Sequence, residues 1–145
     1  MPAPFVHELR VRYGECDPQG IVFNANYLVY FDVAFTELWR EAVGPWKLLH
    51  DHGIDAVVAE ANLDFRAPAR DDEILSLRAR VTRLGSTSIT TEIDYMRDSE
   101  LLVKARLRHV CVARESWKKT DVPQFVREGL RPFCVEEAEA PQAEA

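Results

Sequence analysis

The sequence predicts an α+β fold in which a mainly antiparallel sheet packs against one long helix. The first observation is a single long apolar stretch with helical periodicity, residues 27–43, which follows one strand-like segment. The second is a run of four later segments that alternate apolar and polar residues and are joined by tight turns. Strands with one segregated helix are typical of α+β domains, and a sheet curled around this helix would explain why most of its circumference is apolar.

The N-terminal third contains a strand, a loop and the start of the helix. Residues 5–13 alternate apolar and polar side chains, which predicts a half-buried strand. The Gly- and Pro-bearing segment 14–20 predicts a loop. Asn24 and Asn26 each stand where a side-chain oxygen can cap the first helical turn. Gly44 and Pro45 end the helix, and residues 46–52 predict a short extra turn.

Four further strands are expected at residues 57–66, 75–82, 89–95 and 101–111, each with one face in the core. His109 falls on the inward face of the last strand, and we expect a hydrogen-bonded core histidine there. Residues 123–131 predict a short closing helix. We therefore expect a single domain over residues 1–134 and an acidic, disordered tail over residues 135–145.

Composition and charge exclude several classes of function. A net charge of −6 argues against nucleic acid as a partner, because phosphate binding needs a basic face. No apolar run reaches the roughly 20 residues of a membrane helix, and no signal peptide is evident, so we expect a cytoplasmic protein with no membrane partner. Three widely spaced cysteines indicate neither disulfides nor a redox or metal motif, and His50 and His52 lack a third metal ligand.

The segment whose residues could carry out a reaction is 11–27. It places Asp17 in a tight loop between a strand and a helix start. Helix N-termini carry free N–H groups and a partial positive charge. Such a site can hold an oxyanion while a nearby carboxylate attacks a carbonyl or activates water. The alternative is that Asp17, which precedes a proline, is an ordinary turn aspartate.

This segment resembles the signature of the 4-hydroxybenzoyl-CoA thioesterase family. The residues that carry the resemblance are 13–22, YGECDPQGIV, with Asn26 and Tyr27 closely downstream. The family pattern is an aspartate, a two-residue spacer, a glycine, two aliphatic residues and an aromatic-rich helix that opens on tyrosine. Weaker likeness continues through residues 64–73 and 83–88 and covers roughly residues 5–115.

The resemblance implies a hotdog fold, in which a curved antiparallel sheet wraps one long helix. It implies a thioesterase that hydrolyses a short-chain acyl- or aroyl-CoA to free acid and CoA without a cofactor. The implied assembly is a homodimer, often a homotetramer built as a dimer of dimers, with active sites shared between subunits. Asp17 would be the nucleophile or general base, and a backbone N–H near Asn24 would polarise the thioester carbonyl.

One departure affects the substrate and the class of protein. Many bacterial short-chain members have histidine where this chain has Asn24, which can donate a hydrogen bond but cannot titrate. Aroyl-CoA members also lack that histidine. A hydratase or dehydratase on this fold requires a catalytic histidine, which the segment does not contain. A non-catalytic acyl-CoA or acyl-carrier binding protein remains an alternative, since fold does not fix function.

The substrate-binding candidates each have an ordinary structural interpretation as well. Tyr27 is either a core aromatic residue or part of an acyl pocket. Glu60 is either on the substrate-facing strand or on a solvated strand face. The cations are candidates for binding the CoA phosphates, or else ordinary surface charges: Arg66, Arg70, Arg83 and Lys104. Ser86 and Ser88 are candidates for contacting the pantetheine or nucleotide, or else ordinary hairpin residues.

Overall fold

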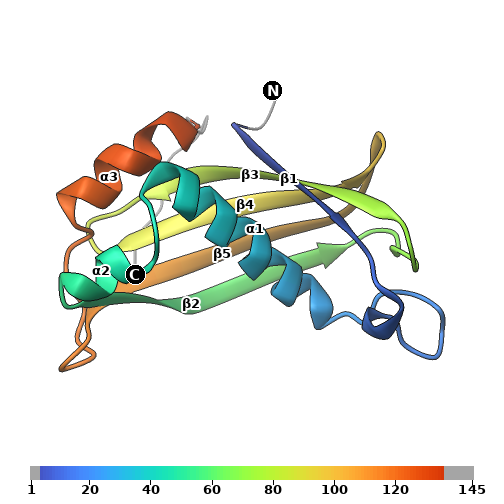
Figure 1. Ribbon diagram of the computed structural model, residues 1–145, viewed down its shortest axis with the longest axis horizontal. Coiled ribbons are helices and arrows are strands. Elements are labelled where there is room, and N and C mark those ends of the chain that lie inside the picture. The colour runs from blue at the N-terminus through green and yellow to red at the C-terminus, as the bar shows by residue number, and fades with distance from the viewer. Residues whose placement is uncertain (1–3, 136–145) are drawn as a thin grey trace.

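The computed structural model describes residues 4–135 and contains five strands, three α-helices and two short 3-10 turns (Figure 1). In chain order these are β1 (Phe5–Arg10), η1 (Tyr13–Glu15), α1 (Asn26–Ala42), α2 (Lys47–Asp51), β2 (Ile54–Phe65), β3 (Ile74–Leu84), β4 (Ser88–Arg97), β5 (Glu100–Ala113), α3 (Gln124–Leu130) and η2 (Arg131–Phe133).

The strands form one antiparallel sheet in the order β1-β3-β4-β5-β2. The long helix α1 crosses one face of this twisted sheet, and α3 lies beside the C-terminal end of α1 (Figure 1). The predicted α+β class, with a single long helix against an antiparallel sheet, is confirmed. The short turn and the closing helix are also confirmed as α2 and α3.

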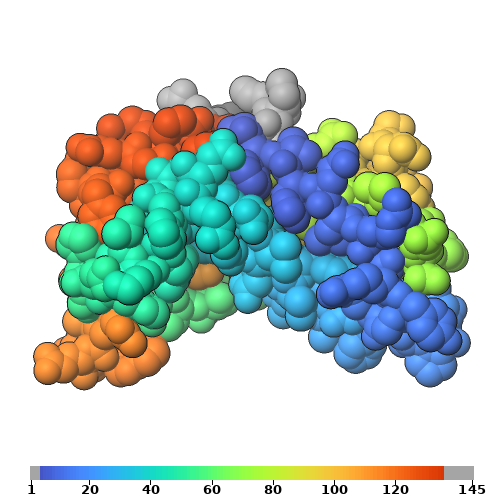
Figure 2. Space-filling view, in the orientation of Figure 1, coloured from blue at the N-terminus to red at the C-terminus, as the bar shows by residue number. Residues whose placement is uncertain are grey.

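One face of α1 provides the helical part of the core. Its buried residues recur at helical spacing: Tyr27, Tyr30, Phe31, Ala34, Phe35, Leu38 and Trp39. The other face is uncovered, as Figure 2 shows for the light-blue to cyan surface of the helix. There Leu28, Val29 and Val33 are 40%, 52% and 39% exposed. The sheet of one chain therefore packs against one side of α1 and leaves the other side exposed.

The start of α1 also differs from the prediction. The helix begins at Asn26, its N-cap is Ala25, and no side chain caps the first turn. The capping prediction for Asn24 and Asn26 is wrong because the Asn26 amide Nδ2 instead donates to the Glu15 carbonyl at 2.8 Å. The first strand ends at Arg10, and Tyr13 lies in the η1 turn with 82% of its surface exposed.

Strand β2 is an edge of the sheet and, among residues 4–135, pairs only with β5. A register shift between Val58 and Glu60 leaves Ala59 as an extra, unpaired residue. Most side chains from Val58 onward are exposed on both faces, so the expected inward and outward alternation holds only weakly. An edge strand with one neighbour has less of the core over it than the central strands have.

His109 of β5 is buried against α1, as expected, with its ring stacked on Phe35 at a centroid distance of 4.4 Å. Within the described residues its Nδ1 atom has no hydrogen-bond partner, so the expectation of a hydrogen-bonded histidine is wrong for that atom. Burial lowers the pKa of His109 to about 4. The imidazole is therefore neutral in the folded protein near pH 7.

The last described residues run along β3. Cys134 forms an isolated bridge with Val81, and the Val135 N–H donates to the Val81 carbonyl at 3.0 Å. The rest of the predicted acidic tail, residues 136–145, lies outside the described residues. None of the helices described is long and apolar enough to span a membrane.

Candidate active site

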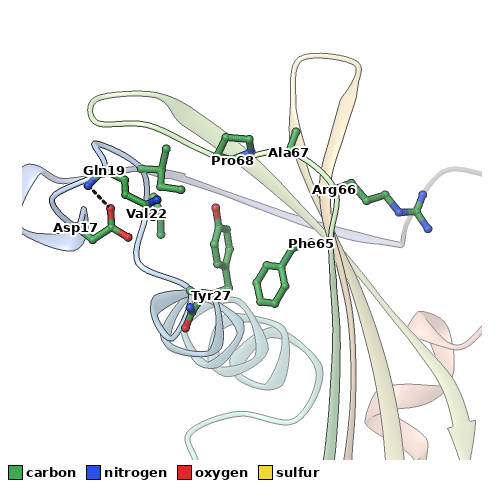
Figure 3. Close-up of a pocket in the computed structure, with 10 residues that line it drawn as sticks. Asp17, Gln19, Val22, Tyr27, Phe65, Arg66, Ala67 and Pro68 are labelled. Atoms are coloured by element: carbon green, nitrogen blue, oxygen red, sulfur yellow. Dashed lines mark hydrogen bonds between the residues drawn. The ribbon is translucent and has the colours of Figure 1, made fainter.

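Asp17 lies in a closed turn that fixes its carboxylate. The Asp17 N–H donates to the Ile21 carbonyl at 2.9 Å, and the Gly20 N–H donates to the Asp17 carbonyl at 2.8 Å. Gly20 has a φ of 82°, a conformation that favours glycine. The Gln19 N–H donates to Asp17 Oδ1 at 2.8 Å (Figure 3). Within residues 4–135, no hydrogen bond uses Oδ2, which is left for other chemistry.

This loop forms one wall of a pocket of about 400 Å³. The other walls come from the start of α1 and from the end of β2 with the segment that follows it. The lining residues are Asp17, Gln19, Ile21, Val22, Asn24, Tyr27, Phe65, Arg66, Ala67 and Pro68. Figure 3 shows the Tyr27 ring standing between the Asp17 loop and Phe65. The pocket thus combines one carboxylate with mainly apolar walls, which suits an acyl group.

Tyr27 is both a core residue and one of the residues that line this pocket. Its ring is 3% exposed and packs edge-to-face on Phe65 and Tyr95, each at a centroid distance of 5.6 Å. Its hydroxyl oxygen accepts from the Ala69 N–H at 3.2 Å. Burial raises the pKa of Tyr27, which keeps the phenol protonated.

Two free backbone donors lie just before α1, and one of them belongs to Asn24, which lines the pocket. Within the described part of the chain, neither the Asn24 N–H nor the Ala25 N–H has a hydrogen-bond acceptor, whereas the Asn26 N–H donates to Phe23. Unpaired N–H groups at a helix N-terminus favour negative charge. A carboxylate, an apolar pocket and free N–H donors together can bind a carbonyl and stabilise the oxyanion formed when it is attacked.

The other sequence-predicted residues lie at varied distances from this pocket. Arg66 lines it, but its guanidinium pairs with Asp64 at 2.9 Å and extends away from Asp17 (Figure 3). Glu60 is outside the pocket and pairs with Arg108 at 3.4 Å.

Three further candidates lie at the opposite end of the sheet from Phe65. Phe65 pairs with Val103 near the start of β5, whereas Ser88 pairs with Val110 near its end. Arg83 pairs with Thr90 close to Ser88, and Ser86 lies in the loop between their strands. Within one chain, none of these three residues is brought to the pocket.

Glu15 is the principal residue that sequence reasoning missed. Its Oε1 accepts from the Tyr30 hydroxyl at 2.7 Å and from the Arg12 N–H at 2.8 Å, and its Oε2 pairs with the Arg12 guanidinium at 2.5 Å. Burial alone would raise the pKa of Glu15, but hydrogen bonds from Arg12 and Tyr30 outweigh it and hold that pKa below its usual value. The Arg12-to-Glu15 spacing was visible in the sequence, whereas the contact with Tyr30 was not.

Cys16 is not activated as a nucleophile. Burial, together with the nearby carboxylates of Asp71 and Asp17, raises the pKa of its thiol. Among residues 4–135, no group of three His, Cys, Asp or Glu side chains is placed to hold a metal ion. Of the side chains that line the pocket, only Asp17 carries a negative charge and only Arg66 a positive one.

Comparison with known proteins gives a consistent result. Residues 19–104, more than half of the chain, match the family model described as the thioesterase superfamily. The matched region begins two residues after Asp17. The acyl-CoA thioester hydrolase YbgC of Shigella flexneri is 28% identical over 119 residues, covering 81% of this chain and 89% of that protein. The acyl-CoA thioesterase YbgC of Haemophilus influenzae is 29% identical over 124 residues, covering 85% and 91%.

The structural comparison supports the same fold. A crystal structure of a thioesterase superfamily protein from Jannaschia sp. CCS1 aligns with a TM-score of 0.84 and 28% identity, covering 90% of this chain and 93% of that one. The hotdog prediction is therefore confirmed.

Proposed function

The chain belongs to the thioesterase superfamily, and from this membership we propose that it hydrolyses an acyl-CoA, with a short-chain acyl or an aroyl group, to the free acid and CoA. It is a thioester hydrolase, which is also the enzyme class of its named homologues. The observation that carries the proposal is that Asp17 and Asn24 line one pocket whose other walls are mainly apolar.

In the proposed reaction the acyl group enters the pocket, and the thioester carbonyl lies between Asp17 and the start of α1. Asp17 Oδ2 attacks the carbonyl carbon, the C–S bond breaks, and CoA leaves as the thiolate, which takes up a proton. Water then hydrolyses the resulting mixed anhydride and regenerates the carboxylate. In the alternative route, Asp17 takes a proton from water as the water attacks.

The backbone N–H groups of Asn24 and Ala25 are the proposed oxyanion donors in either route. They have no acceptor among the described residues, so a developing oxyanion would not compete with an existing hydrogen bond. One such donor typically contributes about 3–4 kcal/mol to lowering the barrier. Asn24 stands where many bacterial short-chain members have a histidine. Because an asparagine side chain cannot titrate, Asp17 is the proposed acid–base group of the pocket. No step requires a metal or cofactor.

We propose a homodimer formed through the β2 edge. Support comes from the unpaired side of β2 and from the exposed apolar side chains Val58 and Phe65, together with the uncovered face of α1. If the β2 strands of two subunits paired antiparallel, the pocket of one subunit would face the far end of the partner's sheet. That end carries the partner's Arg83, the partner's Ser86 and the partner's Ser88. Those residues and Arg66 could then contact the CoA portion, and two dimers would form the expected homotetramer.

The test is thiol release from a panel of short-chain, long-chain and aromatic acyl-CoAs, with native protein and Asp17→Asn. The carboxamide keeps the shape of Asp17 but removes its charge, so we expect kcat to fall by about 1000-fold or more. Asp51→Asn on α2, which removes only the exposed ion pair with Lys47, is the matched control and should leave kcat unchanged.

Equal, negligible release by native protein and Asp17→Asn would overturn the proposal. Tight acyl-CoA binding without release would then favour the non-catalytic binding protein. Full activity in Asp17→Asn would instead reject Asp17 as the catalytic carboxylate.

A further inference from the structure

Glu15 lies two residues before Asp17 and connects the Asp17 loop to helix α1. We propose that Glu15 is a positioning residue, which sets the separation between the Asp17 carboxylate and the N–H donors at the start of α1. This inference rests on the proposed thioesterase function and extends it to a residue outside the pocket lining.

The side chain of Glu15 forms the first part of the connection. Its Oε1 accepts from the hydroxyl of Tyr30, which lies on the second turn of α1, at 2.7 Å. Its other contacts, from the Arg12 N–H at 2.8 Å and from Arg12 Nε at 2.8 Å, secure the entry to the loop. The Glu15 side chain is 14% exposed whereas that of Arg12 is 80% exposed, so solvent screens the hydrogen bond from Tyr30 less than the ion pair with Arg12.

The backbone of Glu15 forms the second part. Its carbonyl accepts from the Phe23 N–H at 3.0 Å and from Asn26 Nδ2 at 2.8 Å. Glu15 therefore contacts the chain on both sides of the Asn24 and Ala25 donors, as well as the next turn of the helix. The bridge between Cys16 and Val22 closes the loop from within.

Positioning matters here because the carboxylate and the oxyanion donors come from different elements. Asp17 lies two residues after Glu15 in the loop, and the proposed donors Asn24 and Ala25 lie between Phe23 and Asn26, which both hydrogen-bond Glu15. A misplacement of about 1 Å at a reacting centre can cost about 100-fold in rate. Loss of one Glu15 hydrogen bond should therefore reduce the rate of chemistry more than it reduces substrate binding.

The principal test is Tyr30→Phe, which keeps the buried ring and removes only the hydroxyl that reaches Glu15. We expect kcat to fall about 10- to 100-fold, with KM within about 2-fold of native. Glu15→Gln, which places an amide N–H against the Arg12 donors, should give the same pattern. Hydrogen exchange of the backbone amides of residues 16–26 should become faster in both variants, because the loop loses the side-chain part of its attachment to α1.

Arg12→Gln and Arg10→Gln form a matched pair. Both remove an arginine from an ion pair with an acidic residue, but Arg12 pairs with Glu15 whereas Arg10 pairs with Asp72. We expect slower turnover and faster loop exchange in Arg12→Gln and neither change in Arg10→Gln.

A Tyr30→Phe kcat within about 2-fold of native, or a loss expressed wholly in KM, would overturn the inference. Equal losses in Arg12→Gln and Arg10→Gln would also overturn it. If native protein releases no thiol, the proposed function fails but the exchange measurements still decide whether Glu15 holds the loop. Unchanged loop exchange in Tyr30→Phe would then reject the connection itself.

Discussion

Asp17 uses its two carboxylate oxygens differently. Oδ1 accepts from the Gln19 N–H and closes the turn, whereas Oδ2 has no hydrogen bond within the described residues. The turn interpretation and the catalytic hypothesis for Asp17 are therefore compatible, since the turn uses only one of the two oxygens.

His109 gives a prediction about stability and pH. Its folded pKa is about 4, whereas that of an unfolded histidine is about 6.5, so between these values the unfolded chain binds the proton and the folded one does not. The stability from burying neutral His109 is thus fully present above about pH 6.5 and is lost as pH falls toward about 4. Between pH 7.5 and 5.0, we expect native protein to lose about 2 kcal/mol more unfolding free energy than His109→Leu.

Urea unfolding at the two pH values measures this difference. His7, His50 and His52 are present in both proteins, so their contributions cancel. An equal loss of unfolding free energy in native protein and His109→Leu would show that His109 does not carry the pH dependence.

At this scale, the sequence identified those pocket residues that are close together in the chain. Asp17, Asn24 and Tyr27 belong to one local motif and do line one pocket. Phe65 and Pro68 line it too, but only folding brings β2 to the loop. Glu15 was missed because its hydrogen bonds to Tyr30 and Asn26 depend on how the loop meets the helix.

Among the elements, α1 was the most predictable and β2 the least. The apolar periodicity of α1 predicts its ends within one residue, because a buried helical face imposes a strict spacing. The sequence of β2 alternates like a central strand, yet the strand lies at an edge and contains a bulge at Ala59. Strand periodicity carries no information about which neighbours a strand has.

The two edge strands provide a controlled test of the dimer. Val58 on β2 and Val6 on β1 are each 50% exposed, but they lie on opposite edges of the sheet. A lysine on an edge strand opposes pairing with another strand. We expect Val58→Lys to convert the assembly to smaller species and Val6→Lys to leave it unchanged, as measured by light scattering after size-exclusion chromatography.

The opposite pattern, with Val6→Lys disrupting the assembly, would move the interface to β1. A native protein that is monomeric at all concentrations would reject the dimer.

On the scale of the whole molecule, α3 closes the fold by packing against the end of α1. Gly129 of α3 lies so close to Ala42 that an added Cβ would stand 2.3 Å from the Ala42 carbonyl oxygen. Gly129→Ala must therefore push the two helices apart, and we expect it to lower the unfolding free energy by about 1–3 kcal/mol. Gly14→Ala, whose Cβ would meet no atom within 4 Å, is the control and should change stability little.

Thermal unfolding of both variants checks this expectation. A Gly129→Ala midpoint equal to that of native protein would mean that α3 can shift away from α1 without loss.

The strand order is the global feature that residue patterns could not supply. Alternation predicted five strands, but only the family resemblance implied their arrangement in a hotdog sheet. The inward face of every strand is apolar, so many different strand orders would bury the same side chains.

The sheet order has a consequence for synthesis. In the described part of the chain the sheet neighbour of β2 is β5, which is made only after β3 and β4. At about 5–20 residues per second, roughly 2–10 seconds separate the end of β2 from the end of β5 at the ribosome. During that interval β2 gains its partner strand only gradually, and its last residue, Phe65, has no partner until Val103 is made. A nascent chain stalled before residue 103 therefore has Asp17 and α1 but lacks the strand that holds the Phe65 wall of the candidate pocket.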